Sequence, residues 1–158
     1  MFIFCTESEF DNHVYFPKSG IEIRIDSSFK TERDLIDYYA RAINSPFPND
    51  NWDGWLDAIC DLSWLPHRHV YVYHKALPRL CREDLDFYVG ALIHADSYWS
   101  SYEPYFNTNA YPNWASYGTK FIFDTAIKQE VLLMYERLKD KYSTRGNLPA
   151  EIISKLEK

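Results

Sequence analysis

Four aspartates recur at helical spacing in one short stretch of the chain, residues 50–62. At about 100° per residue of an α-helix, their carboxylates fall within roughly 80° of one another; they are Asp50, Asp53, Asp57 and Asp61. No lysine or arginine lies between Asn49 and Pro66. Carboxylates in such a row can meet cationic side chains through charge-assisted hydrogen bonds, or they can hold a divalent cation. An ordinary solvated helix face is a third possibility.

The opposite face of the same predicted helix is apolar, as is typical of a helix that packs on a core. It consists of Trp52, Trp55, Leu56, Ile59 and Leu62. On the acidic face, like charges four residues apart destabilise a helix by about 0.2–0.5 kcal/mol per pair. The helix dipole offsets this cost only near the helix start, at Asp50 and Asp53. The chain thus keeps the acidic stripe at a local cost, which is compatible with a role in meeting a positively charged partner, although a solvated polar face is the commoner reason for an acidic stripe.

The motif Asn51-Trp52-Asp53, followed by Asp57 and by Asp61-Leu62, resembles the signature of the barstar family. Phe47-Pro48 before the motif and Trp64 after it strengthen the resemblance. Members of this family are intracellular inhibitors of bacterial ribonucleases. The resemblance therefore implies a cytoplasmic immunity protein that blocks the basic active site of a ribonuclease or other nuclease toxin. It implies no enzymatic activity, no cofactor and no metal.

The resemblance also implies which residues contact the partner. By position in the motif, Asp57 is the central contact and Asp53 its neighbour. The full set of predicted contacts is Asp57, Asp53, Asp50, Asp61, Asn51, Leu56 and Phe47. Asn51 has a second possible role as the helix cap. Leu56 stands where the family prototype has an aromatic that touches the nuclease, and this departure leaves the identity of the target open.

Composition limits the class of partner and the compartment. The chain has 158 residues, of which 46% are hydrophobic, and a formal net charge of −6. This charge argues against nucleic acid and anionic membrane as partners. The three cysteines form no C-x-x-C pair, so we expect reduced thiols. The N-terminus lacks the basic lead-in of a secretory signal, and we expect a cytoplasmic protein that is monomeric when free.

Hydrophobic periodicity predicts an α/β fold with the element order β-α-α-β-α-β-α, which favours a parallel sheet. The resemblance implies a barstar-like sheet of about three strands, with a core at about residues 20–125 of a single domain spanning 1–158. The predicted strands are Ile21–Asp26, His67–His74 and Lys120–Phe123, and the predicted helices are Thr31–Ile43, residues 51–62 and Glu83–Tyr98.

Three additions to this core are also expected. An N-terminal extension contains short strands at Phe2–Cys5 and Val14–Phe16 around a polar turn. A long aromatic loop is inserted at residues 98–117, where apolar periodicity is absent. A helical extension covers residues 126–158: a long helix capped by Asp124 or Thr125, then a short one from Pro149 to Leu156.

Two other functions remain open. The aspartates could serve a metal-dependent enzyme, but the chain has no Gly-rich phosphate loop, no H-E-x-x-H and no G-x-S-x-G motif. Cys60 lies among aspartates, which makes it a poor nucleophile, and it occupies the position where a calcium loop at residues 49–60 would need Glu. His67 and His69 share a strand face without a third metal ligand. The other function is an adaptor for a protein that is not a nuclease, which the change at Leu56 and the aromatic loop keep open.

Overall fold

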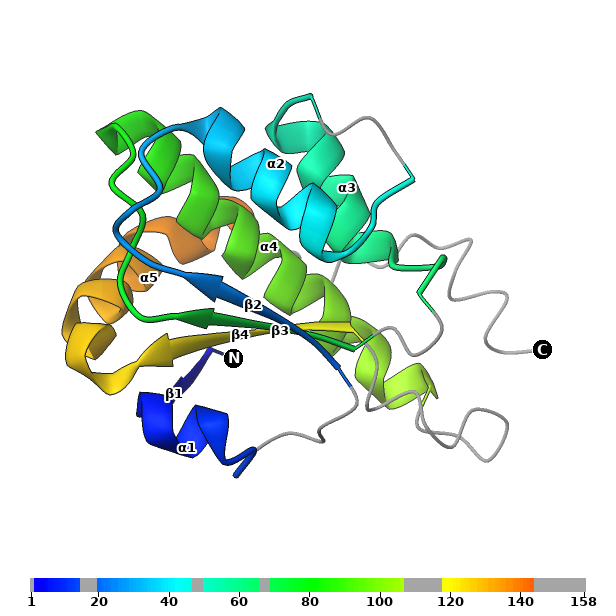
Figure 1. Cartoon of the computed structure of the whole chain (residues 1–158), viewed down its shortest axis with the longest axis horizontal. Coiled ribbons are helices and arrows are strands. Elements are labelled where there is room, and N and C mark those ends of the chain that lie inside the picture. The colour runs from blue at the N-terminus through cyan, green and yellow to red at the C-terminus, as the bar shows by residue number, and fades with distance from the viewer. Residues whose placement is uncertain (1, 15–19, 47–49, 66–68, 107–117, 144–158) are drawn as a thin grey trace.

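A computed structural model describes residues 2–14, 20–46, 50–65, 69–106 and 118–143 (Figure 1). Four strands and five α-helices lie in these ranges. In chain order they are β1 Ile3–Cys5, α1 Glu7–Asp11, β2 Ile21–Ile25, α2 Glu32–Ala42, α3 Trp52–Asp61, β3 His69–His74, α4 Arg82–Phe106, β4 Gly118–Asp124 and α5 Lys128–Tyr142, with a 3-10 turn at Thr125–Ile127 before α5.

The strands form one all-parallel sheet with the order β1-β4-β3-β2. The predicted order β-α-α-β-α-β-α is confirmed from β2 to α5. The N-terminal strand, expected as an extension, joins the sheet as its fourth strand, with Ile3 opposite Ile122 of β4. All four strands therefore end at the same edge of the sheet.

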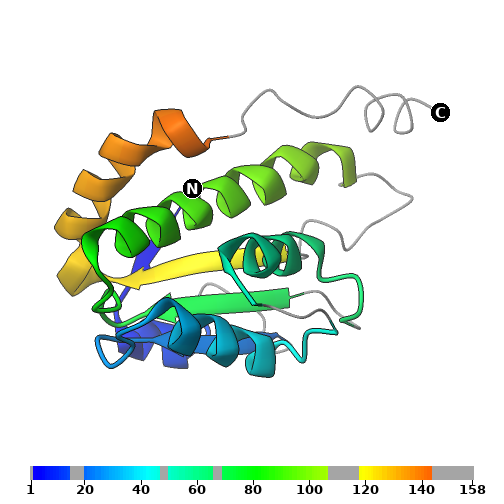
Figure 2. The ribbon, with the colours of Figure 1, turned by 90° about the horizontal axis from the view of Figure 1, so that it is seen from above.

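The helices are divided unequally between the two faces of the sheet. The chain moves from β2 to β3 to β4 in one direction, whereas the connection from β1 to β2 runs in the opposite direction. Because crossovers between parallel strands are right-handed, this reversal places α1 on the face opposite to α2, α3 and α4 (Figure 1). The last helix, α5, lies beside α4 (Figure 2) and is joined to it by a two-bond pair between the Arg137 guanidinium and the Asp86 carboxylate.

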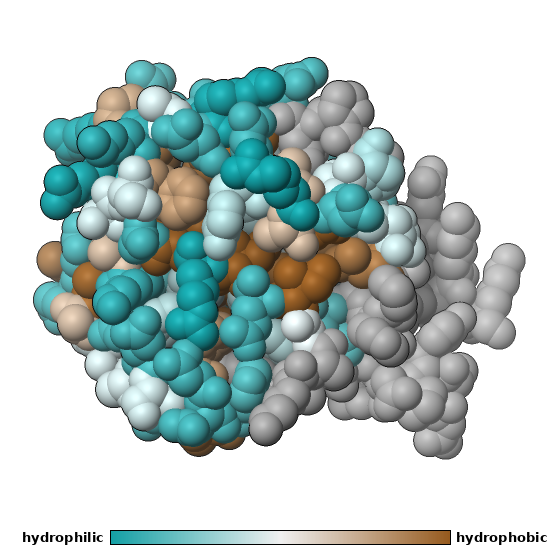
Figure 3. All heavy atoms as spheres, viewed as in Figure 1, coloured by the Kyte–Doolittle hydropathy of each residue, from teal (hydrophilic) through white to brown (hydrophobic). Residues whose placement is uncertain are grey.

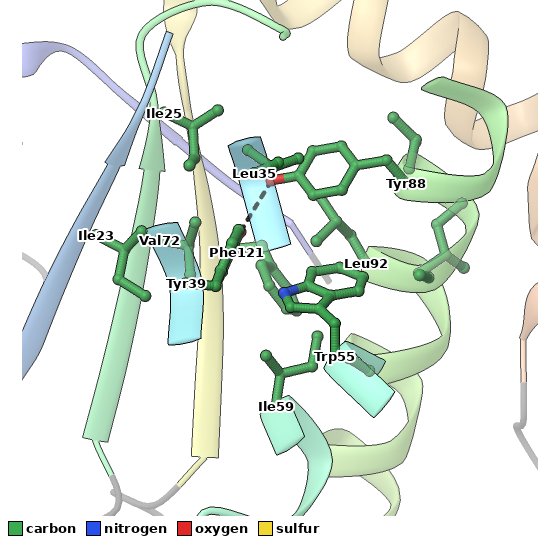
Figure 4. Close-up of a cluster of buried hydrophobic side chains, with 14 of the residues drawn as sticks. Ile23, Ile25, Leu35, Tyr39, Trp55, Ile59, Val72, Tyr88, Leu92 and Phe121 are labelled. Carbon is green, nitrogen blue, oxygen red and sulfur yellow. Dashed lines mark hydrogen bonds between the residues drawn. The ribbon is translucent and has the colours of Figure 1, made fainter. Parts of the chain in front are cut away.

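The main core fills the space between the sheet and α2, α3 and α4. Figure 4 shows side chains from these elements converging there: Ile23, Ile25, Val72 and Phe121 from the strands, and Leu35, Tyr39, Trp55, Ile59, Tyr88 and Leu92 from the helices. Strict alternation along β2 buries Ile23 and Ile25 and leaves Glu22 and Arg24 exposed. In Figure 3, hydrophilic residues cover the upper and lower margins of this side of the molecule, with a hydrophobic band between them.

A smaller cluster lies on the other face of the sheet, under α1. Phe10 stacks on Tyr73 with ring centroids 4.6 Å apart, and Arg24 lies over the Phe10 ring at 5.0 Å. The same guanidinium binds the Asp11 carboxylate at 2.6 Å. Helix α1 was not predicted, although Thr6 and Glu9 form the reciprocal capping box that starts it and this pattern is readable in sequence. The expected strand Val14–Phe16 begins as a bend at Val14, and its other residues lie outside the described part of the chain.

Helix α4 is longer than its apolar periodicity predicted. It continues to Phe106, so the first part of the expected aromatic loop is helical. Trp99, one residue beyond the predicted end, is buried and donates its indole N–H to the Ile59 carbonyl, which carries the buried face past Tyr98. The rest of that loop, residues 107–117, and the predicted terminal helix Pro149–Leu156 lie outside the described residues. Asp124 or Thr125 was expected to cap the last long helix, but α5 has Ile127 at its N-cap, without a side-chain hydrogen bond. Asp124 instead caps the 3-10 turn before α5: its side chain accepts from the Ala126 N–H at 2.8 Å.

A chain of hydrogen bonds crosses the main core at His74. Its Nδ1–H donates to the Ile122 carbonyl at 3.1 Å. The other ring nitrogen, Nε2, accepts from the Tyr88 hydroxyl at 2.7 Å, and the Tyr39 hydroxyl completes the chain at 2.8 Å from that of Tyr88. Burial lowers the pKa of His74 to about 4, against the opposing effect of hydrogen bonds to backbone carbonyls. The imidazole is therefore neutral in the folded protein.

We expect this histidine to make stability depend on pH. In the unfolded chain His74 binds a proton below its ordinary pKa of 6.5, whereas in the folded chain it stays neutral down to about pH 4. Its contribution to stability is therefore complete above pH 6.5 and is lost as the pH falls from 6.5 to 4. The loss amounts to about 3 kcal/mol over that window. Urea unfolding across this range measures the loss, and an NMR titration showing His74 protonated near pH 6.5 would contradict it.

Candidate functional site

The acidic helix α3 begins at a capping residue. The Asn51 side-chain oxygen accepts the N–H of Gly54 at 2.9 Å, and its backbone carbonyl accepts that of Trp55 at 3.1 Å. The capping role foreseen for Asn51 is thus confirmed. Because the cap satisfies a helix N–H that would otherwise lack a partner, Asn51 fixes the point at which the acidic face begins.

Two tryptophans attach α3 to the core. Trp52 is 8% exposed and Trp55 is fully buried. Trp55 contacts the ring of Tyr39 at 5.2 Å and that of Tyr88 at 5.5 Å, and Trp52 stacks on Phe87 at 5.7 Å. Neither indole N–H has a hydrogen-bond partner within the described residues. These side chains therefore hold α3 by ring packing, and their indole N–H groups contribute no hydrogen bond to the attachment.

The C-terminal end of α3 is attached by hydrogen bonds. The Ile59 carbonyl accepts from the indole N–H of Trp99 in α4 and from the hydroxyl of Thr119 in β4, both at 3.0 Å. Trp99 reaches this carbonyl because Gly118, at φ +105°, leaves room for it. A Cβ on Gly118 would lie 2.5 Å from the Trp99 ring. Both ends of α3 are thus held, and its outer face is presented on a rigid support.

Asp53, Asp57 and Asp61 are exposed on that outer face. Asp50 is also exposed, but it precedes the cap residue Asn51 and so lies just before the helix, not on the helical stripe where the sequence placed it. Asp53 and Asp57 make no ion pair and no side-chain hydrogen bond within the described residues. Asp61 accepts a hydrogen bond from the Ser63 hydroxyl at 3.1 Å. Asp50, whose side chain is 74% exposed, lies 3.8 Å from the Arg33 guanidinium of α2. An exposed pair at this distance contributes at most about 1 kcal/mol, so the stripe remains largely uncompensated.

A hollow of about 420 Å³ lies beside the stripe, between α3 and α4. It is lined by Leu56, Asp57, Cys60, Asp61, His94 and Tyr98. His94 and Tyr98 both fall within the predicted helix Glu83–Tyr98, but nothing in the sequence indicates that they adjoin α3. Burial, together with the nearby Asp57 charge, raises the pKa of the Cys60 thiol to about 12, so the thiol stays protonated. Phe47, the remaining predicted contact, lies outside the described residues.

The described residues contain neither a group of side chains that could hold a metal ion nor a helix that could span a membrane. Three of the carboxylates follow one another along α3 and that of Asp50 precedes the helix, and no three His, Cys, Asp or Glu side chains in the described ranges form a group that could hold a metal ion. Within the same ranges, no helix combines the length and the apolar character needed to cross a membrane.

The fold and the exposed carboxylates define an α/β protein with one parallel sheet that presents an acidic helix. A family model described as Barstar (barnase inhibitor) matches residues 22–110, more than half of the chain. The protein belongs to the barstar family. Neither a curated protein nor a solved structure gives a significant match. The match covers β2 through α4, while β1, α1, β4 and α5 lie outside it.

Family membership supports the broader sequence predictions. Inhibitors of this family are not enzymes, and membership suggests that this protein is a ribonuclease inhibitor that binds a ribonuclease such as barnase.

Proposed function

We propose that this protein inhibits a basic ribonuclease by placing α3 against the cationic active site of the enzyme. A ribonuclease must hold cationic side chains around the phosphate that it cleaves. The carboxylates of Asp57 and Asp53 would meet those side chains in place of the RNA phosphates. The observation that carries the proposal is the exposure of both carboxylates on a helix that is held at both ends.

The chemistry of the contact follows from the charges involved. Hydrogen bonds between carboxylates and guanidinium groups are short, strong and often bidentate. Asp57 lies at the rim of the hollow between α3 and α4, where a cationic side chain could approach it from one side. We assign Asp57 the central role and Asp53 the neighbouring one, with Asp50 and Asp61 contributing mainly to attraction at longer range.

Leu56 and Asn51 have different roles in this proposal. Leu56 is half-buried beside Asp57 and packs partly on the core, so it offers the partner a small apolar contact where an aromatic is usual. Asn51 is occupied as the cap of α3 and acts by positioning the aspartates. Phe47, before the helix, remains a predicted contact.

The biological setting follows from the same proposal. Inhibitors of this family protect the cell that makes a ribonuclease, and we infer that this protein is a cytoplasmic immunity protein of a bacterium, with a nuclease toxin as its target. A net charge of −6 would speed encounter with a basic toxin.

The proposal is tested by measuring RNA cleavage by barnase, and by any nuclease that proves to be encoded beside this protein, as the protein is titrated in. We expect inhibition at one equivalent of protein, with an association rate that falls as salt is added, because salt screens the attraction between opposite charges. Binding whose association rate is independent of salt would contradict the acidic-helix mechanism. Saturable binding of a protein without nuclease activity, in the absence of any ribonuclease inhibition, would favour the adaptor function instead.

A further inference from the structure

A second hollow lies at the carboxyl edge of the sheet, where the chain leaves β2 and β3. It has a volume of about 780 Å³ and is lined by Asp26, Ser27, Ser28, Lys30, Lys75, Ala76 and Arg79. Two backbone hydrogen bonds join its walls: the Lys75 N–H donates to the Ile25 carbonyl at 2.9 Å, and the Arg79 N–H donates to that of Phe29 at 2.8 Å. The two loops are therefore fixed relative to each other, and the hollow is formed in advance of any ligand.

The charge of this hollow is opposite to that of the chain as a whole. Three of its residues are cationic and one is acidic, in a protein with a net charge of −6. The Lys75 ammonium binds the Glu7 carboxylate at 2.9 Å. The Asp26 carboxylate accepts the Ser28 N–H at 2.7 Å, and hydrogen bonds from Ser28 lower its pKa. Both groups are thus occupied by partners within the protein.

The other two cations of the hollow have no partner among the described residues. Across the described ranges, Lys30 and Arg79 make no ion pair and no side-chain hydrogen bond, and both are exposed. The Ser27 hydroxyl is likewise without a side-chain hydrogen bond in those ranges. A lysine, an arginine and a hydroxyl at one rigid hollow provide an ammonium, a planar pair of guanidinium donors and a neutral donor. This combination suits the oxygens of a phosphate group.

The lining also limits the kind of ligand. Among the described residues that line the hollow, Ala76 is the one apolar residue and none is aromatic, so a nucleobase would find no ring on which to stack. The volume is within the range of small-molecule sites. We propose that this hollow binds a small phosphate-containing anion, of the kind represented by pyrophosphate, through Lys30, Arg79 and the Ser27 hydroxyl.

This site is separate from the acidic helix. The Ile59 carbonyl near the end of α3 is bonded to Thr119, the second residue of β4, so the C-terminal end of α3 lies at the amino edge of the sheet. The proposed anion site lies at the opposite, carboxyl edge. It can therefore exist whether or not α3 binds a ribonuclease, and the two can be tested independently.

Calorimetric titration of the full chain with sodium pyrophosphate, with backbone amide NMR in parallel, tests the proposal. We expect saturable binding that shifts the amide resonances of Ser27, Ser28 and Ala76. The double variant Lys30→Gln/Arg79→Gln removes two exposed cations without breaking an internal ion pair, and it should weaken binding at least about tenfold. The single variant Arg79→Gln is matched by Arg41→Gln, because Arg41 is an exposed arginine on α2 outside the hollow. Arg41→Gln should leave binding unchanged.

Three results would overturn the proposal. The first is the absence of saturable binding by the unmodified protein. The second is an equal loss of affinity in Arg79→Gln and Arg41→Gln, which would mean that pyrophosphate responds only to overall charge. The third is tighter binding of a short single-stranded RNA than of pyrophosphate through the same residues, which would make the site a nucleic-acid contact.

Discussion

Replacing Asp57 by alanine is expected to raise the dissociation constant of the ribonuclease complex by about 30- to 5,000-fold. This range corresponds to the 2–5 kcal/mol generally lost when one partner of a buried, hydrogen-bonded charge pair is removed. In the free protein Asp57 is exposed, so truncation breaks nothing inside the fold. In the proposed complex, truncation leaves a cationic group of the nuclease buried without a partner. Calorimetric or kinetic binding measurements on purified proteins provide the comparison.

The same substitution should leave the folded protein intact or slightly more stable. Alanine is a better helix former than aspartate. Removing the Asp57 charge also removes its repulsion from Asp53 and Asp61, each four residues away on the helix. Loss of binding therefore cannot be attributed to unfolding. Asp140→Ala, on the exposed face of α5, removes one negative charge far from the stripe in sequence and serves as the matched control for net charge. Equal dissociation constants for the Asp57 and Asp140 variants would exclude Asp57 as the central contact.

Replacing Trp55 by alanine is expected to lower the free energy of unfolding by about 3–5 kcal/mol, the usual effect of removing a large buried aromatic side chain. Trp55 is fully buried and contacts the rings of Tyr39, Trp52 and Tyr88. Its removal would leave a cavity at the centre of the layer that joins α3 to α2 and α4. Urea unfolding followed by far-UV circular dichroism measures the change without depending on tryptophan fluorescence.

Two further variants separate packing from polarity at this position. Trp55→Phe keeps a ring while removing an indole N–H that has no partner in the described residues. Leaving such a group buried costs about 1–3 kcal/mol, so we expect the phenylalanine variant to lose much less stability than the alanine variant. Leu133→Ala, at a side chain 64% exposed, should change stability by no more than about 0.5 kcal/mol. Comparable losses at Leu133 and Trp55 would contradict the assignment of Trp55 to the core.

The acidic helix could be predicted from sequence because one of its faces is acidic and the other is apolar. A period of 3.6 residues separates the aspartates from Trp52, Trp55 and Ile59, and the structure exposes the first group and buries the second. Alternation along β2 was equally informative, since one face of that strand packs on the core. Both predictions use local periodicity, which is a property of one element and does not require knowledge of its neighbours.

Contacts between distant elements could not be obtained in this way. Arg33 approaches Asp50 from α2, and His94 and Tyr98 approach α3 from α4; none of these residues is near the aspartates in sequence. The hollow at the carboxyl edge is a further example, because it is lined from two loops that β2 and β3 bring together. Helix α1 is different: its Thr6–Glu9 capping box was present in the sequence, but the segment was interpreted as a turn because it is short and polar.

The place of β1 in the sheet bears on how the protein is made. Residue 3 pairs with residue 122, so β1 has no partner until the whole stretch between the two strands has been synthesised. Pairings between such distant segments slow folding. Until β1 docks, the outer edge of β4 presents unpaired backbone groups, and an open strand edge of this kind invites association with other chains. β1 thus covers the β4 edge at Ile122–Asp124, and it can do so only after β4 has been made.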